Sequence, residues 1–205
     1  MFQDRIDAGT QLAQKLKQFT NSGAVILAVP RGGVPVAYII ARELACSLQI
    51  ILAKKIGHPH NKEYAIGAAS LEDYFIIPHE NITEEYVAGQ LKTIRARLQE
   101  MQRLFVNNAA NENLDGKVVI IVDDGIATGN TLLVTVQLLQ KSNPSKIIIA
   151  VPVASHHAVQ MLMGHVDEVV ALHISDDFSG VGSYYKDFKE VTDEEVNFYL
   201  NKVTS

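Results

Sequence analysis

The chain has 205 residues, of which 47% are hydrophobic and 20% are charged. That balance is typical of a globular protein and excludes a disordered, collagen-like or low-complexity chain. The 18 lysines and arginines against 23 aspartates and glutamates give a net charge of -5, which argues against a protein that coats a nucleic-acid backbone. We expect one domain over residues 1–205 and no nucleic-acid partner.

Cysteine usage and hydropathy restrict the compartment. Cys46 is the single cysteine, so no disulfide can form within the chain. The sequence has neither an N-terminal secretory pattern nor an apolar run long enough to span a membrane. These features predict a cytoplasmic protein without a membrane partner.

Short apolar runs alternate with helical patterns along the chain. The expected strands cover residues 24–29, 48–53, 118–122, 147–151 and 166–173. Helical patterns cover residues 4–20, 83–107 and 193–202, and further helices are expected to begin near residues 34, 131 and 155. Strands that alternate with helices predict an α/β fold with a mostly parallel central sheet and helices on both of its faces.

Two of the segments between these strands have patterns of their own. The segment 83–107 repeats apolar residues four and three positions apart, which places them on one stripe of a helix. A coiled coil is an alternative interpretation, but a helix that lies on its own sheet fits the short length better. The loop 57–63 is rich in turn-forming and charged residues, and we expect it to be mobile.

Unusual residues stand at three of the expected strand ends, and ligands of an open parallel sheet bind beyond such ends. The first strand ends in a Pro-Arg-Gly-Gly turn at residues 30–33, the second in a lysine pair at 54–55, and the central one in an aspartate pair at 123–124. Taken alone, a surface arginine, solvated lysines and helix-capping aspartates explain these residues. Their convergence at one edge favours a binding site with two cationic parts and one acidic part.

The loop after the aspartate pair, residues 125–131, consists mostly of small and hydroxyl-bearing residues and leads into a helix. Free backbone amides at the positive end of a helix bind phosphate, and Thr128 and Thr131 add hydroxyl donors. Asp123 and Asp124 would repel a phosphate, so we expect them to accept hydrogen bonds from sugar hydroxyls or to hold a hydrated cation. The pattern therefore predicts a ribose 5-phosphate site.

The stretch VVIIVDDGIATGNT at residues 118–131 resembles the phosphoribosyl pyrophosphate (PRPP) signature of type I phosphoribosyltransferases. The order of the 30–33 turn, the lysine pair with its loop, and the signature is also similar to the order of the pyrophosphate loop, flexible loop and 5-phosphate loop in that family. The resemblance covers roughly residues 24–190. It implies a Rossmann-like core with a small hood built from the terminal segments.

The resemblance assigns a role to each matching position. The PRPP-binding positions that it implies are Arg31, Gly32, Lys54, Lys55, Asp123, Asp124, Ile126, Ala127, Thr128, Gly129, Asn130 and Thr131. The aspartates would contact the ribose hydroxyls, the loop 126–131 the 5-phosphate, and the turn and lysines the pyrophosphate. Magnesium would be held mainly by PRPP and water, so no metal-binding set of protein residues is expected.

The implied reaction displaces pyrophosphate from the anomeric carbon of PRPP by a nitrogen atom of a nucleobase or another small acceptor. A transition state that resembles an oxocarbenium ion calls for leaving-group stabilisation and exclusion of water, for which the segment 56–64 would serve as a lid. Hypoxanthine-type relatives carry an acidic residue at the position of Ala127, where it assists the purine. The catalytic acid or base of this chain is therefore unassigned.

The segment 178–188 follows the last expected strand, where purine-type relatives have the hood that clasps the base. Phe178 would stack on an acceptor ring, and Tyr184 or Tyr185 would line it. Hydrophobic packing of a terminal segment is the alternative interpretation of these side chains. The identity of the acceptor stays open.

Three functional hypotheses result. The first is a PRPP-dependent phosphoribosyltransferase, expected to be a homodimer because dimers are common among the relatives. The second is a PRPP-sensing regulatory protein of the same fold, which Ala127 favours and the charged loop disfavours. The third is a phosphoacceptor receiver domain, which places its acidic pair near its first strand, whereas more than half of this chain precedes residue 123.

Overall fold

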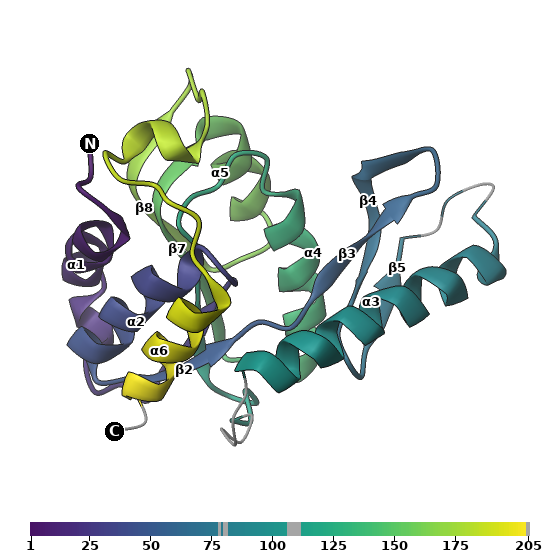
Figure 1. The fold of residues 1–205 in the computed structure, drawn as a ribbon, viewed down its shortest axis with the longest axis horizontal. Coiled ribbons are helices and arrows are strands. Elements are labelled where there is room, and N and C mark those ends of the chain that lie inside the picture. Colours follow the sequence, from purple (N-terminus) through teal and green to yellow (C-terminus); the bar gives the residue numbers. More distant parts are fainter. Residues whose placement is uncertain (78, 80–81, 106–111, 204–205) are drawn as a thin grey trace.

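The computed structural model describes residues 1–77, 79, 82–105 and 112–203. A larger body holds a parallel sheet between helices, and a smaller part projects from one side of it (Figure 1). The projecting part, here called the lobe, consists of β3 (Lys54–His58), β4 (Asn61–Ala69), β5 (Tyr74–Ile76) and α3 (Glu84–Phe105). The expected α/β class with a parallel sheet is confirmed, and the lobe adds a second, antiparallel sheet.

The central sheet has five parallel strands in the order β2-β1-β6-β7-β8. Their bounds are Val25–Ala28 for β1, Ser47–Ile50 for β2, Val118–Val122 for β6, Lys146–Ser155 for β7 and Glu168–Ser175 for β8. β1 and β6 are almost wholly buried because helices cover both faces of the sheet. They pair with Ala28 opposite Val122, so the turn at 30–33 and the aspartate pair leave the sheet side by side.

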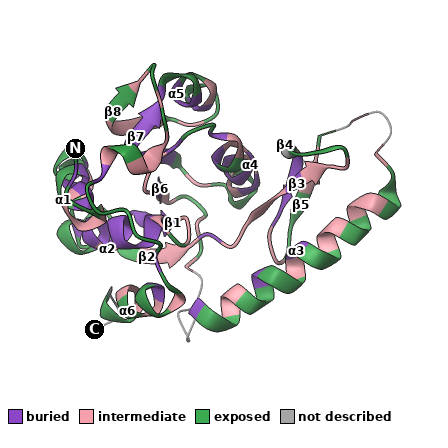
Figure 2. Ribbon diagram, turned by 45° about the horizontal axis from the view of Figure 1, so that its top comes forward, coloured by how far each residue is buried: buried purple, intermediate pink, exposed green. Residues whose placement is uncertain are grey.

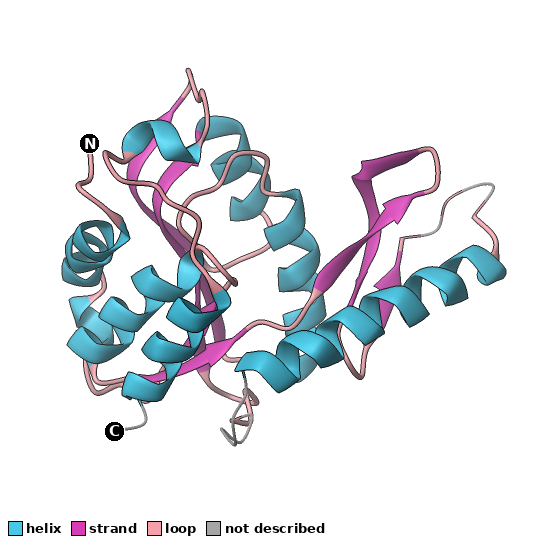
Figure 3. Cartoon of the chain, viewed as in Figure 1, coloured by secondary structure: helices cyan, strands magenta, loops and turns pink. Residues whose placement is uncertain are grey.

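Helices form a layer on each face of the sheet (Figure 3). One layer contains α1 (Arg5–Lys15), α2 (Gly33–Leu44) and α6 (Asp193–Val203), and the other contains α4 (Asn130–Leu139) and α5 (His156–Met163). Short 3-10 turns occur at Lys17–Phe19, Gln140–Ser142 and Val181–Tyr184. This is the arrangement that alternating strands and helices predict.

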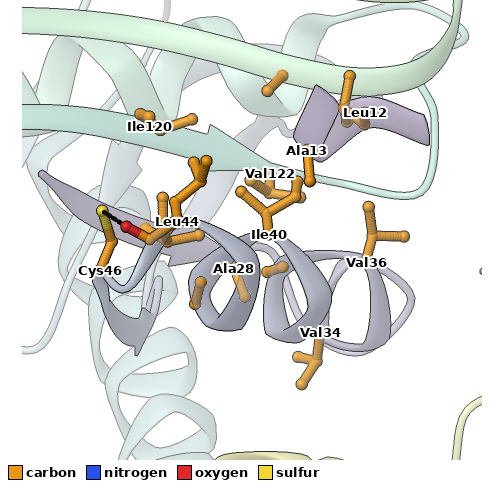
Figure 4. Packing of buried hydrophobic residues seen from close by; sticks show 14 of the residues in the cluster. Leu12, Ala13, Ala28, Val34, Val36, Ile40, Leu44, Cys46, Ile120 and Val122 are labelled. Carbon is orange, nitrogen blue, oxygen red and sulfur yellow. Dashed lines mark hydrogen bonds between the residues drawn. The ribbon is translucent and has the colours of Figure 1, made fainter. Parts of the chain in front are cut away.

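The contact between α2 and the sheet shows why this layer is stable. Val36, Ile40 and Leu44 recur one helical turn apart and are fully or almost fully buried. They pack in one cluster with Ile120 and Val122 of β6 (Figure 4). The apolar stripe of α2 thus fixes the helix N-terminus, and with it the preceding turn, at the end of the sheet.

The boundary between the central sheet and the lobe differs from the sequence prediction. The strand expected at 48–53 ends at Ile50, and the chain then crosses to the lobe, where Lys54 and Lys55 open β3. The prediction that the lysine pair closes a strand of the central sheet is therefore wrong. Both lysines belong instead to an antiparallel sheet, in which Lys54 pairs with Ala69.

The prediction of a loop at 57–63 is also wrong, because most of this segment is strand. β3 and β4 form a hairpin with a turn at Pro59 and His60. Gly57 lies inside β3 at a shift of register, where an added Cβ would be 2.6 Å from the carbonyl oxygen of Lys62. The absence of a side chain at Gly57 thus allows the backbones of β3 and β4 to approach closely.

α3 lies along the lobe sheet, which confirms the prediction of a helix on its own sheet. Ile94 and Leu98 pack with Ile56, Ile66 and Ala69 in a cluster separate from the two cores of the main body. The rest of the helix surface is mostly exposed (Figure 2). Residues 106–107 of the expected helix lie outside the described residues.

The terminal segments pair with each other above the end of the sheet. The amide of Phe2 donates to the carbonyl of Tyr184, and the amide of Lys186 donates to that of Phe2. The rings of Phe2 and Tyr185 are buried together, with centroids 5.3 Å apart. These segments form the expected hood.

The described helices contain no stretch that is both long and apolar enough to cross a membrane.

The lobe cluster predicts a strong effect of one substitution. Leu98→Ala removes a fully buried side chain and is expected to lower the free energy of unfolding by about 2–5 kcal/mol, because a cavity remains. The exposed Lys92→Ala on the same helix should change it by less than about 0.5 kcal/mol. Urea unfolding followed by circular dichroism measures both. Equal stability of the two variants would contradict the packing described for α3.

Candidate active site

The turn between β1 and α2 lies directly against the end of β6. A Cβ added to Gly32 would collide with the carboxylate of Asp124, and one added to Gly33 would lie 2.6 Å from the carbonyl oxygen of Val122. At Gly33 the obstacle is backbone, so a side chain has no room, and at Gly32 the carboxylate of Asp124 would have to move. The fold thus brings together two parts of the predicted site, the glycine turn and the aspartate pair.

Arg5 of α1 faces the aspartate pair and was not predicted from the sequence. Its Nε and Nη2 donate to Asp124 Oδ2 at 2.9 and 2.8 Å, and only 11% and 14% of these two side chains is exposed. The guanidinium also lies 4.0 Å from the ring centroid of Phe188, and its Nη1 donates to the carbonyl of Lys189. A partly buried contact through two guanidinium nitrogens orients the carboxylate as well as neutralising it.

The two aspartates nevertheless repel each other. Burial raises the pKa of Asp123 well above its usual range, and the charge of Asp124 raises it further. Burial also raises the pKa of Asp124, against the opposing charge and hydrogen bonds of Arg5. Asp123 Oδ1 accepts a hydrogen bond from the amide of Asp124 at 2.8 Å, which fixes its orientation. Hydroxyl donors or a cation at this site would stabilise the charged pair.

The loop 126–131 presents backbone amides that, apart from that of Ile126, have no partner among the described residues. Within the described residues, the amides of residues 127–132 donate no hydrogen bond. α4 begins at Asn130, directly after Gly129, whose φ is +74°. Thr128 and Thr131 are exposed on the same loop. Unpaired amides at a helix N-terminus are the groups that bind anions in proteins.

Ser155 at the end of β7 makes hydrogen bonds to this loop. The amide of Ser155 donates to the carbonyl of Ile126 at 2.9 Å, and its hydroxyl donates to the carbonyl of Ala127 at 2.6 Å. The same hydroxyl oxygen accepts from the amide of Ala158 and caps α5. Two carbonyls of the loop are thus held by Ser155.

A cavity of about 700 Å³ opens beside the aspartate pair and the glycine turn. Its lining includes Arg5, Arg31, Gly32, Lys54, Asp124 and Phe188, together with the α3 residues 97, 100, 101, 104 and 105. Arg31 is held by two acidic residues of the C-terminal segment, with Nη1 2.9 Å from Glu190 Oε1 and Nε 2.7 Å from Asp193 Oδ1. These ion pairs are partly exposed and therefore contribute little stability.

Of the predicted residues, Arg31, Gly32, Lys54 and Asp124 line this cavity, whereas Asp123, the loop 126–131, Lys55, Phe178 and Tyr184 are not among its lining residues. Lys55 is half-buried in β3 but does not line the cavity, unlike Lys54. The rings of Phe178 and Tyr184 stack on each other, with centroids 5.5 Å apart, and pack against the cluster of Phe2 and Tyr185. Hydrophobic packing is thus the contact that both aromatic side chains make.

The residues that sequence reasoning missed come from distant parts of the chain. Arg5 belongs to the first helix, Arg97 to the lobe helix, and Phe188 to the last loop before α6. None of them stands at the end of a strand of the central sheet, where the sequence patterns pointed. An arginine on an amphipathic helix carries no local signal of a site, since solvated arginines are common there.

The carboxylates do not form a metal site on their own. Among the described residues, no three His, Cys, Asp or Glu side chains are grouped as metal ligands. Asp123 and Asp124 supply the oxygen ligands that Mg²⁺ takes, but too few to complete its shell.

The fold places the aspartate pair, the glycine turn and the loop 126–131 at one end of the parallel sheet. The chain belongs to the phosphoribosyl transferase domain family, whose model matches residues 3–188. It is 35% identical over 207 residues to a protein of Mycobacterium tuberculosis (strain H37Rv) named "Putative phosphoribosyl transferase Rv0571c". That match covers 98% of this chain and 47% of the relative, so the chain spans about half the length of the curated relatives it matches.

Solved structures agree on the fold. The crystal structure of TT1426 from Thermus thermophilus is 36% identical, with a TM-score of 0.91 and 98% of both chains covered. A purine phosphoribosyltransferase from Pyrococcus horikoshii is 19% identical, with a TM-score of 0.50 over 92% of this chain and 93% of its own. The second likeness concerns the fold alone.

The close approach of Gly33 to the end of β6 predicts that a methyl group added at this position lowers the free energy of unfolding. Gly33→Ala places its Cβ against backbone atoms of residues 122 and 123, which cannot move away, and should lower the free energy of unfolding by about 1–3 kcal/mol. Gly164→Ala, where an added Cβ meets open space, is the matched control and should stay within about 0.5 kcal/mol of the wild type. Chemical unfolding compares the two, and an unaffected Gly33→Ala variant would disprove the close approach.

The raised pKa of Asp123 predicts that ionisation of this carboxyl group lowers the stability of the folded protein. The folded protein keeps a proton that the unfolded chain releases, so wild-type stability falls as the pH rises from about 4 through the raised pKa. Asp123→Asn keeps the oxygen that accepts from the amide of Asp124 but cannot ionise. It should therefore be more stable than the wild type at pH 7 by about 1 kcal/mol or more, and the difference should shrink toward pH 4.

The exposed Asp177→Asn is the control for this prediction and should follow the wild-type pH profile. The measurement is the free energy of unfolding between pH 4 and pH 8. A less stable Asp123→Asn protein at pH 7 would show that Asp123 is not under electrostatic strain.

Proposed function

We propose that this chain transfers ribose 5-phosphate from PRPP to a nitrogen atom of a nucleobase or another small acceptor, with release of pyrophosphate. The observation that carries the proposal is the row of unpaired amides at residues 127–132 next to a largely buried aspartate pair. The amides match the 5-phosphate, and Asp123 and Asp124 match the ribose hydroxyls. One anion site and one hydroxyl-accepting site side by side suit a phosphorylated sugar better than a free nucleotide base or an acidic peptide.

The glycine turn supplies the other end of the substrate. Within the described residues, the amides of Arg31 and Gly32 donate no hydrogen bond, and both residues line the cavity. In the proposed complex these amides donate to the pyrophosphate, while the guanidinium of Arg31 exchanges its exposed carboxylate partners for the ligand. The leaving group would then be stabilised where its negative charge develops.

The proposed reaction breaks the bond between the anomeric carbon and a pyrophosphate oxygen and forms a carbon–nitrogen bond. Asp123 and Asp124 hold the ribose in place through its hydroxyls. Mg²⁺, bound through PRPP, water and these carboxylates, would neutralise pyrophosphate charge. The chain's own residues orient the sugar, exclude water from the cavity and stabilise the leaving group.

Tyr185 is a structural residue and not a candidate base. Its hydroxyl donates to the carbonyl of Asp124 at 2.6 Å, and burial raises its pKa. For the acceptor, Phe178 and Tyr184 remain proposed contacts, although an acceptor between them would have to displace their stacking. Phe188 lines the cavity beside Arg5 and offers an aromatic surface next to the proposed sugar site.

A PRPP-sensing protein of the same fold is the second candidate. Two observations favour it: Ala127 provides no acid or base beside the phosphate loop, and Arg31 is bound by Glu190 and Asp193 of the C-terminal segment. In such a protein, the release of Arg31 by pyrophosphate would free the C-terminal segment. The two candidates share the PRPP site and differ in turnover. We further propose that the protein works in the cytoplasm as a homodimer.

Isothermal calorimetry with PRPP and Mg²⁺ tests the shared site. The wild type should bind, and the Asp123→Asn/Asp124→Asn double variant should bind at least about 10-fold more weakly, a loss of about 1.4 kcal/mol. Asp177→Asn is the control. Equal affinity of the double variant and the wild type would reject the assignment of the ribose site.

Turnover separates the two candidates. A panel of nucleobases and small amines is incubated with PRPP, Mg²⁺ and the protein, and pyrophosphate release is measured. Release with one acceptor supports the transferase, whereas binding of PRPP without release across the panel supports the sensor.

A further inference from the structure

A second cavity lies at the junction of the main body and the lobe. Its volume is about 380 Å³, and none of the described residues that line it also lines the cavity beside the aspartate pair. Ala53 and Gln102 line the second cavity, whereas their neighbours Lys54 and Met101 line the first. The two cavities are thus separated by the last turns of α3 and by the segment 51–53, which joins β2 to β3 (Figure 1).

The walls of the second cavity are mostly apolar and come from both parts of the molecule. Leu27 and Ile51 belong to a core cluster of the main body, and Leu139 of α4 packs against that cluster. Leu52 and Leu71 pack against the lobe cluster. Small-ligand sites are mostly apolar cavities of about 300–1,000 Å³ and often lie between structural parts, so this cavity has the size and setting of such a site.

Two amide side chains supply uncharged polar groups to this cavity. Gln49 of β2 and Gln102 of α3 line it, and both residues are half-buried. Neither side chain makes a hydrogen bond to another described residue. An amide side chain has two N–H donors and one oxygen acceptor. Each glutamine can therefore bind a ligand that carries a donor beside an acceptor, which is the pattern that amide side chains recognise on the edge of a nucleobase.

The charged side chains of the lining are all acidic. Glu72, Asp73 and Glu112 line the second cavity, and no lysine or arginine is among its described lining residues. Three cations lie near its rim: Lys117 is 3.5 Å from Glu112 Oε1, and Arg95 and Lys141 donate to the backbone carbonyls of residues 72 and 74. Because the lining itself carries only negative charge, it repels phosphate esters such as PRPP and favours an uncharged ligand.

We propose that this cavity is a second ligand site, separate from the proposed PRPP site, for an uncharged nitrogen heterocycle with the donor and acceptor pattern of a nucleobase. The heterocycle would lie against the apolar walls, and Gln49 and Gln102 would bind its edge. A free base and its nucleoside share this chemistry, whereas a nucleotide adds the phosphate that the acidic lining repels.

This site is not the acceptor site of the proposed reaction. An acceptor has to reach the anomeric carbon of a sugar held by Asp123 and Asp124, and neither aspartate lines the second cavity. The inference therefore goes beyond the proposed function and does not depend on it.

Amide proton and nitrogen shifts of the whole isotope-labelled chain test the site. Adenine, guanine, cytosine and uracil are titrated separately, each also as its nucleoside and as its nucleoside 5′-monophosphate. At least one base or nucleoside is expected to shift the amides of residues 49–53 and 70–73 with saturation, and saturating ribose 5-phosphate should leave these shifts in place. The matching monophosphate should bind there at least about 10-fold more weakly, because of the acidic lining.

Two variants test the amide contacts with the ligand that binds. Gln49→Leu and Gln102→Leu keep a side chain of similar size but remove the donors and the acceptor, and each should weaken binding by up to about 10-fold. Gln99→Leu, on the same helix as Gln102 but exposed and outside the lining, is the matched control and should bind as the wild type does.

Several outcomes would overturn the second site. Shifts confined to residues 123–132 and 178–188 would show that the heterocycle binds only at the proposed active site. Wild-type affinity in both glutamine variants, or no shift at residues 49–53 with any base or nucleoside, would also reject it. A monophosphate that binds there as tightly as its base would reject the uncharged class of ligand.

The second site and the proposed function can fail separately. PRPP binding and pyrophosphate release decide the proposed function, whereas the shifts at residues 49–53 decide the second site. Circular dichroism of each variant verifies that the substitutions leave the fold intact.

Discussion

The site depends on two carboxylates that the fold holds together against their mutual repulsion. Asp123 and Asp124 follow the central strand, and burial raises the pKa of both. Such a pair is costly without compensation. The contact from two nitrogens of Arg5 stabilises part of this buried negative charge. A bound sugar with free hydroxyls, or a bound cation, would stabilise the remainder.

The need to stabilise the aspartate pair also explains why the terminal segments are part of the site. Arg5 comes from the first helix, stacks on Phe188 and donates to the backbone of the last loop. The hydroxyl of Tyr185 donates to the carbonyl of Asp124 in the same region. The two ends of the chain are thus anchored on the aspartate pair, and the hood that they form is positioned by the residues that are proposed to bind ribose.

The sequence predicts those parts of the site in which structure follows from adjacent residues. An apolar strand, two acids and a small-residue loop before a helix lie in a single stretch, so the candidate phosphate loop and the aspartate pair could be identified directly. The glycine turn could be placed beside them because parallel strands end at the same edge. These predictions use local chemistry and one topological rule.

The remaining parts depend on tertiary contacts that leave no local signal. Arg5 and Asp124 are 119 positions apart, and nothing in the pattern around Arg5 distinguishes it from a solvated arginine. The hairpin of β3 and β4 resembled a loop because Gly57 and Pro59 are turn-forming residues. Ile94 and Leu98 of α3 pack on its strands, and this long-range contact favours strand over loop. Lys54 does line the cavity, but it does so from the lobe and not from the end of a strand of the central sheet.

The central claim is that the loop amides bind the 5-phosphate while the neighbouring acids hold the sugar. A titration of the isotope-labelled protein with ribose 5-phosphate, followed by amide proton and nitrogen shifts, tests it most directly. The largest shifts are expected at residues 127–132, with smaller ones at 123 and 124, because a phosphate that accepts from these amides deshields their protons. Saturating ligand that leaves the amides of 127–132 unchanged, or that shifts only residues elsewhere, would contradict the claim.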